Sequence, residues 1–145
     1  MLSKKTKYAI IALVRLAREY KQGALQIGVL AEEENIPKKF LEAILRDLKN
    51  AGILTSIKGR NGGYYLSQDP EKVNLATIIR LFNGPIAFIP CVTYLYYEAC
   101  DVEKDEDLCG IRTVFKEVRD ATVEIFKRAT LAEIIRREDA LRQQQ

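Results

Sequence analysis

The stretch from residue 37 to residue 66 constrains the fold of this chain more than any other. Residues 37–51 carry leucine and isoleucine at spacings of three and four, which predicts an amphipathic helix. Residues 53–57 then alternate as a strand, residues 58–63 form a glycine-rich turn, and residues 64–66 return as a second strand. The sequence therefore predicts a helix that is followed at once by a short β-hairpin.

Two further helices are predicted before this unit. Residues 3–20 carry apolar side chains on one stripe, and residues 27–34 form a shorter helix. Asn35 and Ile36 then make a tight turn, and Pro37 suits the first position of the next helix. The helices at residues 27–34 and 37–51 are joined by this tight turn and are followed in the sequence by the hairpin. This order favours a winged helix-turn-helix domain. The alternative for the helix pair is an ordinary helical core, and the alternative for the hairpin is an ordinary solvated turn.

Basic side chains lie on the outer face of the helix predicted at residues 37–51 and at the tip of the hairpin. Residues 1–84 contain 14 Lys and Arg against 8 Asp and Glu, whereas residues 85–145 contain 9 against 12. A basic front half favours a polyanionic partner, here double-stranded DNA. The predicted DNA-binding residues are Lys38, Lys39, Glu42, Arg46, Lys49, Lys58 and Arg60. The cations suit phosphates and groove edges, and a glutamate can accept from a cytosine amino group. A winged helix that docks another protein is the competing function.

Several other classes of protein are disfavoured. The chain has no histidine, which excludes Ser-His and Cys-His nucleophile pairs and the common zinc sites that use histidine. Nothing marks a paired acid and base, so we expect no enzymatic activity. The apolar runs are too short to span a bilayer and the N-terminus shows no signal-peptide pattern. These features predict a cytoplasmic protein with no membrane partner.

The clearest periodicity lies in the second half, after a helix predicted at residues 75–82. Apolar positions alternate spacings of three and four at Leu108, Ile111, Phe115, Val118, Thr122, Ile125 and Ala129. This is the seam of a helix that packs against another helix, most simply that of a second copy of the chain. Packing against the chain's own first helix is the alternative. Residues 131–141 follow as a charged amphipathic helix.

The fold class predicted from these segments is mainly α with a small β-hairpin. We expect a winged helix-turn-helix DNA-binding domain at residues 1–84 and a cysteine-containing sensor loop at residues 85–107. A long dimerisation helix and a C-terminal helix should fill residues 108–145. The length of 145 residues suits one domain with an arm.

Three cysteines, Cys91, Cys100 and Cys109, lie between the predicted winged-helix domain and the start of the seam helix. An odd number cannot pair completely within one chain. Cys109 lies near a predicted helix N-terminus, which stabilises a thiolate, but many acidic residues surround the three thiols and oppose it. Three interpretations stay open: an iron–sulfur cluster or metal site, redox-active thiols without a cluster, and cysteines that pack as small apolar residues.

The sequence resembles the Rrf-two family of winged-helix transcription regulators, which includes the IscR, NsrR and CymR types. The resemblance rests on Thr6-Lys7-Tyr8-Ala9, on the stretch 36–54, on the hairpin 56–64 with its Gly-x-x-Gly-Gly-Tyr pattern, and on residues 73–80. It implies a homodimer on a roughly palindromic operator. It also implies that Glu42 reads a base and that Lys58 contacts DNA from the wing.

The resemblance further implies an iron–sulfur cluster on Cys91, Cys100 and Cys109, whose state reports redox conditions, nitric oxide or cluster supply. The chain departs from the family pattern here, because eight residues separate each neighbouring pair where five are usual. The histidine or the acidic residue on the first helix that completes the site in some members is also missing, since Lys7 stands at the matching position. A regulator that responds through free thiols or another ligand is therefore the alternative.

Overall fold

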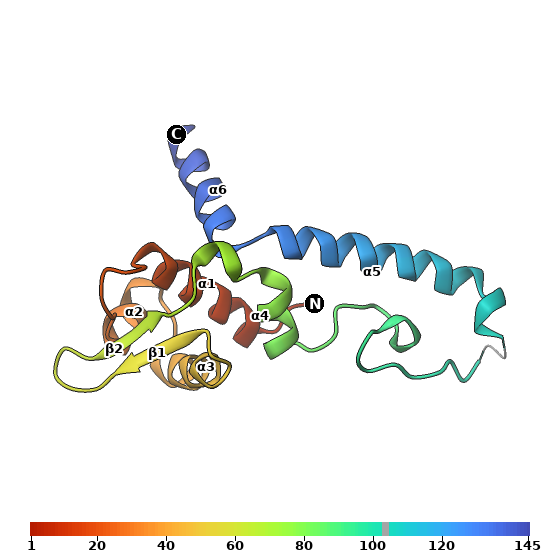
Figure 1. The fold of residues 1–145 in the computed structure, drawn as a ribbon, viewed down its shortest axis with the longest axis horizontal. Coiled ribbons are helices and arrows are strands. Elements are labelled where there is room, and N and C mark those ends of the chain that lie inside the picture. Colours follow the sequence, from red (N-terminus) through yellow and green to blue (C-terminus); the bar gives the residue numbers. More distant parts are fainter. Residues whose placement is uncertain (103–104) are drawn as a thin grey trace.

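The computed structural model describes residues 1–102 and 105–145 of the chain (Figure 1). It is mainly helical with one two-stranded antiparallel sheet, which confirms the predicted fold class. The elements, with short 3₁₀ turns written η, are α1 (Lys4–Arg18), α2 (Ile27–Glu33), α3 (Lys38–Asn50), β1 (Leu54–Ile57), β2 (Gly63–Leu66), η1 (Pro70–Lys72), α4 (Leu75–Phe82), η2 (Pro90–Val92), η3 (Glu106–Leu108), α5 (Gly110–Arg128) and α6 (Leu131–Gln143).

Helix α1 is the centre of the domain and packs against α3, α4 and α6. Its inward stripe includes Ala9, Ala12, Leu13 and Leu16, each almost completely buried. The alanines allow neighbouring helices to approach closely, and the leucines fill the space between them. The Ser3 side chain caps the helix by accepting from the backbone N–H of Thr6 at 3.1 Å.

Helices α2 and α3 form the helix-turn-helix pair. Asn35, between them, has a φ of 53°, a left-handed conformation that asparagine tolerates better than most residues. Helix α3 buries the predicted side chains Leu41, Ile44, Leu45 and Leu48. Pro37 is the N-cap of α3 and not its first residue, so the helix begins one residue later than the sequence predicts.

The hairpin after α3 is the predicted wing. Strands β1 and β2 are antiparallel, with Leu54 opposite Leu66 and Ile57 opposite Gly63. Leu25, from the segment before α2, extends this pairing, since its N–H donates to Tyr64 at 2.8 Å and its carbonyl accepts from Tyr64 at 2.9 Å. The wing is therefore hydrogen-bonded to the helix-turn-helix unit along its base.

Helices α5 and α6 leave and rejoin the winged-helix domain. Figure 1 shows α5 extending away from the domain, with the segment between α4 and α5 running beside it. Two main-chain bonds join the α5–α6 junction to the start of α4: Leu75 donates to Ala129 at 3.0 Å and Leu131 donates to Val73 at 2.8 Å. Helix α6 then packs on α1, where Arg18 pairs with Glu138 at 2.6 Å.

Three further predictions from the sequence are wrong, two on helix ends and one on a seam residue. The first helix ends at Arg18 and not at residue 20, and Lys21 follows with a positive φ of 63°. Leu108 belongs to a separate 3₁₀ turn, so α5 begins at Gly110, with Cys109 as its N-cap. Ala129 is buried at the end of α5, where its carbonyl accepts from Leu75, and it is therefore not part of an exposed seam.

The predicted domain boundaries at residues 84 and 107 remain a prediction, and residues 103 and 104 of the sensor loop lie outside the described residues. Among the helices that the structure describes, none is long and apolar enough to cross a membrane.

The close contact between the wing and Leu25 leaves no room for a side chain at Gly63. A Cβ at Gly63 would clash with the backbone carbonyl oxygen of Leu25, so Gly63→Ala must push the hairpin away from its base. Overpacking of this kind costs about 1–3 kcal/mol, and we expect Tm to fall by roughly 3–10 °C in thermal unfolding. Gly28→Ala is the control, because a Cβ at Gly28 meets no atom within 4 Å. Equal Tm values for the two variants would contradict the packing described for the wing.

Candidate nucleic-acid interface

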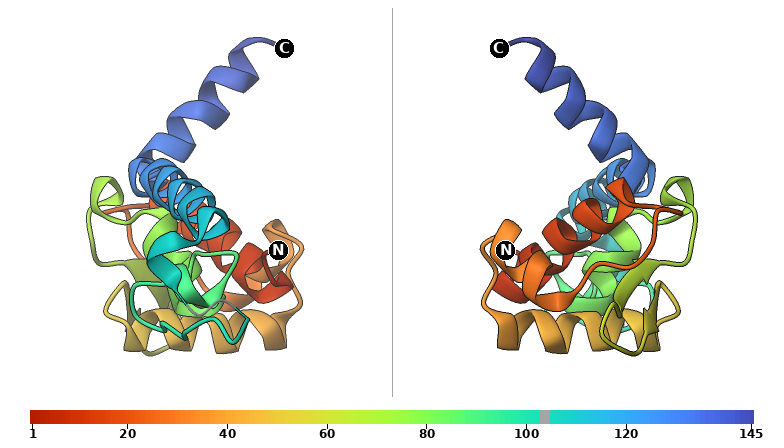
Figure 2. Two further views of the ribbon diagram at one scale, coloured as in Figure 1. Left: turned by 90° about the vertical axis from the view of Figure 1, so that its right-hand side faces the viewer. Right: turned by 90° about the vertical axis from the view of Figure 1, so that its left-hand side faces the viewer.

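Helix α3 and the hairpin tip present their polar side chains on the side of the domain away from α6. Both views in Figure 2 place α3 along the edge opposite α6, and Figure 1 looks nearly along α3 with the hairpin extending beside it. Lys38, Lys39, Arg46 and Lys49 are exposed on α3, while Glu42 is half-buried among them. A convex helix with long cations on its free face has the shape that enters a major groove.

The hairpin tip adds Lys58 and Arg60, both exposed. Gln26, the N-cap residue of α2, donates its side-chain N–H to the Arg60 carbonyl at 3.0 Å. The turn itself is tight, because the Gly62 N–H donates to the Gly59 carbonyl at 3.0 Å and Gly59 has a φ of 111°. Gln26 is a positioning residue that the sequence analysis missed, since nothing in the sequence shows that residue 26 reaches residue 60.

The charges on this side are uncompensated. Within residues 1–102 and 105–145, none of the predicted DNA-binding cations on α3 and the hairpin forms an ion pair. Asp47 is an acid on the same helix, and it is engaged by Lys5 of α1 at 3.0 Å. Cations held apart from carboxylates leave a positive surface that attracts a polyanion.

Phe40 lies at the edge of the exposed face of α3, against α1, and was not predicted as a site residue. Its ring is 51% exposed and contacts Tyr8 of α1 edge-to-face, with 6.1 Å between ring centroids. An exposed aromatic residue on the polar side of an amphipathic helix breaks the pattern of α3, and that break was the signal available in the sequence. Such a ring suits apolar contact with a thymine methyl group.

The three cysteines line one cavity of about 600 Å³ between η2, the segment before η3 and the start of α5. Cys91 is buried, Cys109 is half-buried and Cys100 is exposed. The Cys109 sulfur accepts from the backbone N–H of Arg112 at 3.4 Å as the N-cap of α5. The structure thus brings the predicted residues to one place.

Arg112 and Glu106 organise the wall of this cysteine cavity, and the sequence analysis assigned Arg112 no role. The Arg112 guanidinium donates to the Cys91 carbonyl at 3.4 Å and lies 3.5 Å from Glu106. Glu106 also accepts from the Tyr97 hydroxyl at 2.7 Å and from the backbone N–H of Cys100 at 3.3 Å. The hydrogen bond from Tyr97, more than the charge of Arg112, lowers the pKa of Glu106.

The cysteine cavity does not form a finished metal site. Among the described residues, no group of three Cys, Asp or Glu side chains is arranged so that it could hold a metal ion. Sharing a cavity is a weaker condition than coordination, since the thiolates of a single-metal site must lie within about 2.3 Å of that one metal.

Helix α5 has two dissimilar faces. Its inner face meets the loop before it, with Val123 buried and Phe115 in contact with Phe88 at 6.1 Å between centroids. Its outer face carries an exposed apolar stripe of Ile111, Val114, Val118 and Ile125. This stripe contains part of the predicted seam, and in the described chain it does not pack against α1 as the alternative required.

The comparison with known families decides the identity of this winged helix. A model of the Rrf2 (Rrf-two) family, described as an iron-dependent transcriptional regulator, matches residues 2–137. The chain belongs to the Rrf2 family. An rrf2-like HTH-type transcriptional regulator of Rhodobacter capsulatus is 45% identical over 121 residues, which cover 81% of each chain. The CymR regulator of Bacillus subtilis is 29% identical over 133 residues, covering 92% of this chain and 88% of CymR.

Solved structures agree with this assignment. The structure of CymR from B. subtilis, called a global cysteine regulator, matches with a TM-score of 0.76 and 28% identity over 92% of this chain and 95% of CymR. IscR from T. potens shares the fold with a TM-score of 0.75 at 23% identity, covering 100% of this chain and 91% of IscR. The protein is therefore a winged-helix DNA-binding transcription regulator of the Rrf2 family and not an enzyme, as the sequence predicted.

Proposed function

We propose that this Rrf2 regulator binds a two-fold symmetric operator as a homodimer. Helix α3 enters the major groove, and Lys58 and Arg60 hold the flanking backbone. The observation that carries the proposal is the set of cations without ion-pair partners on one side of α3 and the wing. Hydrogen bonds to Leu25 and Gln26 hold the wing against the rest of the domain. We also propose that the protein is located in the cytoplasm, because a DNA-binding regulator must reach the chromosome.

Base reading in this proposal falls to Glu42. A carboxylate on the groove side of α3 can accept from a cytosine amino group, and each well-made base contact is worth about 1–3 kcal/mol of discrimination. Lys38, Lys39, Arg46 and Lys49 lie around Glu42 on the exposed face of α3 and suit phosphates. Docking onto a protein is the competing function, but it gives no reason for the unpaired cations.

The DNA contacts are tested by salt dependence. Selection from genomic DNA should yield an enriched motif, and anisotropy titrations on that motif should show affinity falling steeply with salt. We expect Lys38→Ala and Lys58→Ala each to lower the slope of log K against log salt by about 1, because each removes one phosphate contact. Glu42→Ala should instead relax base preference at one position of each half-site.

Lys72→Ala is the control for these DNA titrations, since Lys72 is an exposed lysine in η1, which packs on α6. A slope near zero for the wild type, or no enriched motif, would favour the docking function. If Lys72→Ala lowered the slope of log K against log salt as much as Lys38→Ala and Lys58→Ala do, the assignment of α3 and the wing as the DNA interface would be contradicted.

The dimer is proposed to form through the exposed stripe of α5. Val118 lies in the middle of this stripe and is 36% exposed in the single chain. We expect Val118→Asp to weaken dimerisation at least tenfold in analytical ultracentrifugation, because an unpaired carboxylate in an apolar interface loses its hydration. Thr113→Asp adds the same charge at an exposed position off the stripe and should leave the dimer intact. A dimer that survives Val118→Asp would contradict this interface.

We also propose that the cysteine cavity is the signal-sensitive part of the molecule. It is lined by the segment that connects α4, which belongs to the winged-helix domain, to α5, which we assign to the dimer, and by the first turn of α5. A change there alters how the two recognition helices are spaced. The description of the family as iron-dependent makes an iron–sulfur cluster one occupant, and free thiols that oxidise are the other.

Anaerobic purification tests the cysteine cavity, with an absorption spectrum and iron and sulfide analysis. With a cluster, each single Cys→Ala variant of Cys91, Cys100 and Cys109 should lose iron. With free thiols, iron is absent and oxidation alone changes DNA affinity. In both cases we expect the signal to change affinity about five- to 150-fold, and the triple Cys→Ala variant to be insensitive. DNA affinity that is identical in wild type and triple variant under all these conditions would refute a sensing role.

A further inference from the structure

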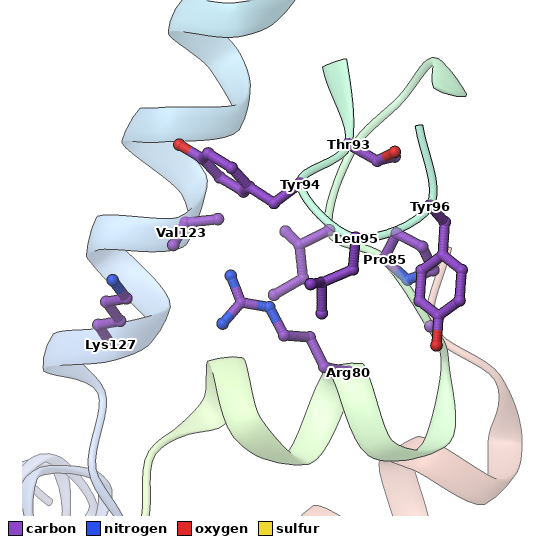
Figure 3. A pocket seen from close by; sticks show the side chains of 10 residues that line it. Arg80, Pro85, Thr93, Tyr94, Leu95, Tyr96, Val123 and Lys127 are labelled. Carbon is purple, nitrogen blue, oxygen red and sulfur yellow. The ribbon is translucent and has the colours of Figure 1, made fainter. Parts of the chain in front are cut away.

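A second cavity, of about 440 Å³, lies between α4, the loop that follows it, and α5 (Figure 3). Arg80 reaches into it from α4, and Tyr94, Leu95 and Tyr96 come from the loop. Val123 of α5 is the buried apolar part of its wall. This volume is in the range of small-molecule pockets. The proposed DNA contacts and cysteine site do not use these residues, so the cavity has no assigned role.

The charge of this α4–α5 cavity is one-sided. Arg80 and Lys127 both line it, from α4 and α5, and no carboxylate is among its described lining residues. Neither cation forms an ion pair within the described residues, although most arginines of the C-terminal half do. Two cations from separate helices that converge on an apolar hollow, without a protein anion, leave a place for an anion from outside.

Tyr94 is held in place as an aromatic wall. Its hydroxyl donates to Asp120 at 2.8 Å, and the Arg119 guanidinium lies 4.1 Å from the ring centroid. Arg119 also donates to the Val92 carbonyl and to Asp120 at 2.9 Å, so Asp120 is already engaged within the chain. The hydrogen bond to Asp120 raises the pKa of Tyr94, and the positive charge of Arg119, more than that of Arg80, opposes this shift.

We propose that the α4–α5 cavity binds a small aromatic carboxylate. The carboxylate would pair with the Arg80 guanidinium, whose planar donors match its two oxygens, and Lys127 would add a second positive charge. The planar body would lie against Tyr94, Leu95 and Val123, which offer rings and methyl groups but few polar atoms. An inorganic anion would leave this apolar part of the hollow unfilled.

The position of the cavity gives such a ligand an effect, which rests on the proposed DNA-binding dimer. One ligand would contact α4 of the winged-helix domain, the loop that contains Cys91 and the long helix α5. A molecule that binds one arrangement of these three parts better than another shifts the population toward it. The binding test below contains no DNA, so its failure is separate from any failure of the proposed DNA binding.

The test is calorimetric titration of the full chain with 2-naphthoate. We expect saturable binding with Kd below about 1 mM. Arg80→Gln should weaken binding about tenfold or more, because it removes the charged hydrogen bonds, and Lys127→Gln should weaken it less. Arg128→Gln is the matched control: it removes one exposed charge from the next position on α5, outside the cavity. Its Kd should equal that of the wild type.

Two further ligands separate the parts of the proposal. Neutral 2-naphthamide and inorganic phosphate should each bind at least tenfold more weakly than 2-naphthoate. Phosphate that binds as tightly as naphthoate would overturn the aromatic part of the assignment. No saturable binding by naphthoate, binding unaffected by Arg80→Gln, or an equal loss in Arg128→Gln would overturn the site itself.

Discussion

The burial of α1 is the interaction on which the rest of this structure depends. Helices α3, α4 and α6 all pack on it, and its alanines and leucines are almost completely removed from water. Apolar burial stabilises by about 25 cal/mol per Å², so one helix covered on several sides supplies much of the core of a small domain. Because α1 holds α3 and α4 together, it fixes the recognition surface relative to the base of α5.

Polar main-chain contacts transmit this rigidity to the functional surfaces. The wing is joined to Leu25 by two backbone hydrogen bonds, and the α5–α6 junction is joined to Val73 and Leu75 by two more. Each surface that we assign to a partner therefore sits at the end of an anchored element. The DNA surface is rigid near its base, while α5 extends beyond the core and has an apolar outer face.

The cations of this chain fall into two groups, those that are paired within the chain and those that are not. Arg18, Arg112 and Arg119 bind carboxylates or carbonyls of the same chain and hold α6, the cysteine cavity and Tyr94 in place. In the described parts of the chain, the cations of α3, those of the wing and Arg80 form no ion pair. We therefore assign the first group to architecture and propose that the second binds anions from outside the chain.

The sequence by itself determined the local elements, because apolar spacing and turn residues act over a few positions: the buried face of α3 and the glycine-rich wing were both predicted correctly. It also predicted the cysteines as one group, but not that Arg112 and Glu106 lie among them. Only the tertiary structure brought Gln26 to Arg60, Arg80 to Lys127, and Ala129 into the core. These contacts join residues that are distant in sequence, and their geometry follows from how whole helices pack on α1, which no local pattern encodes.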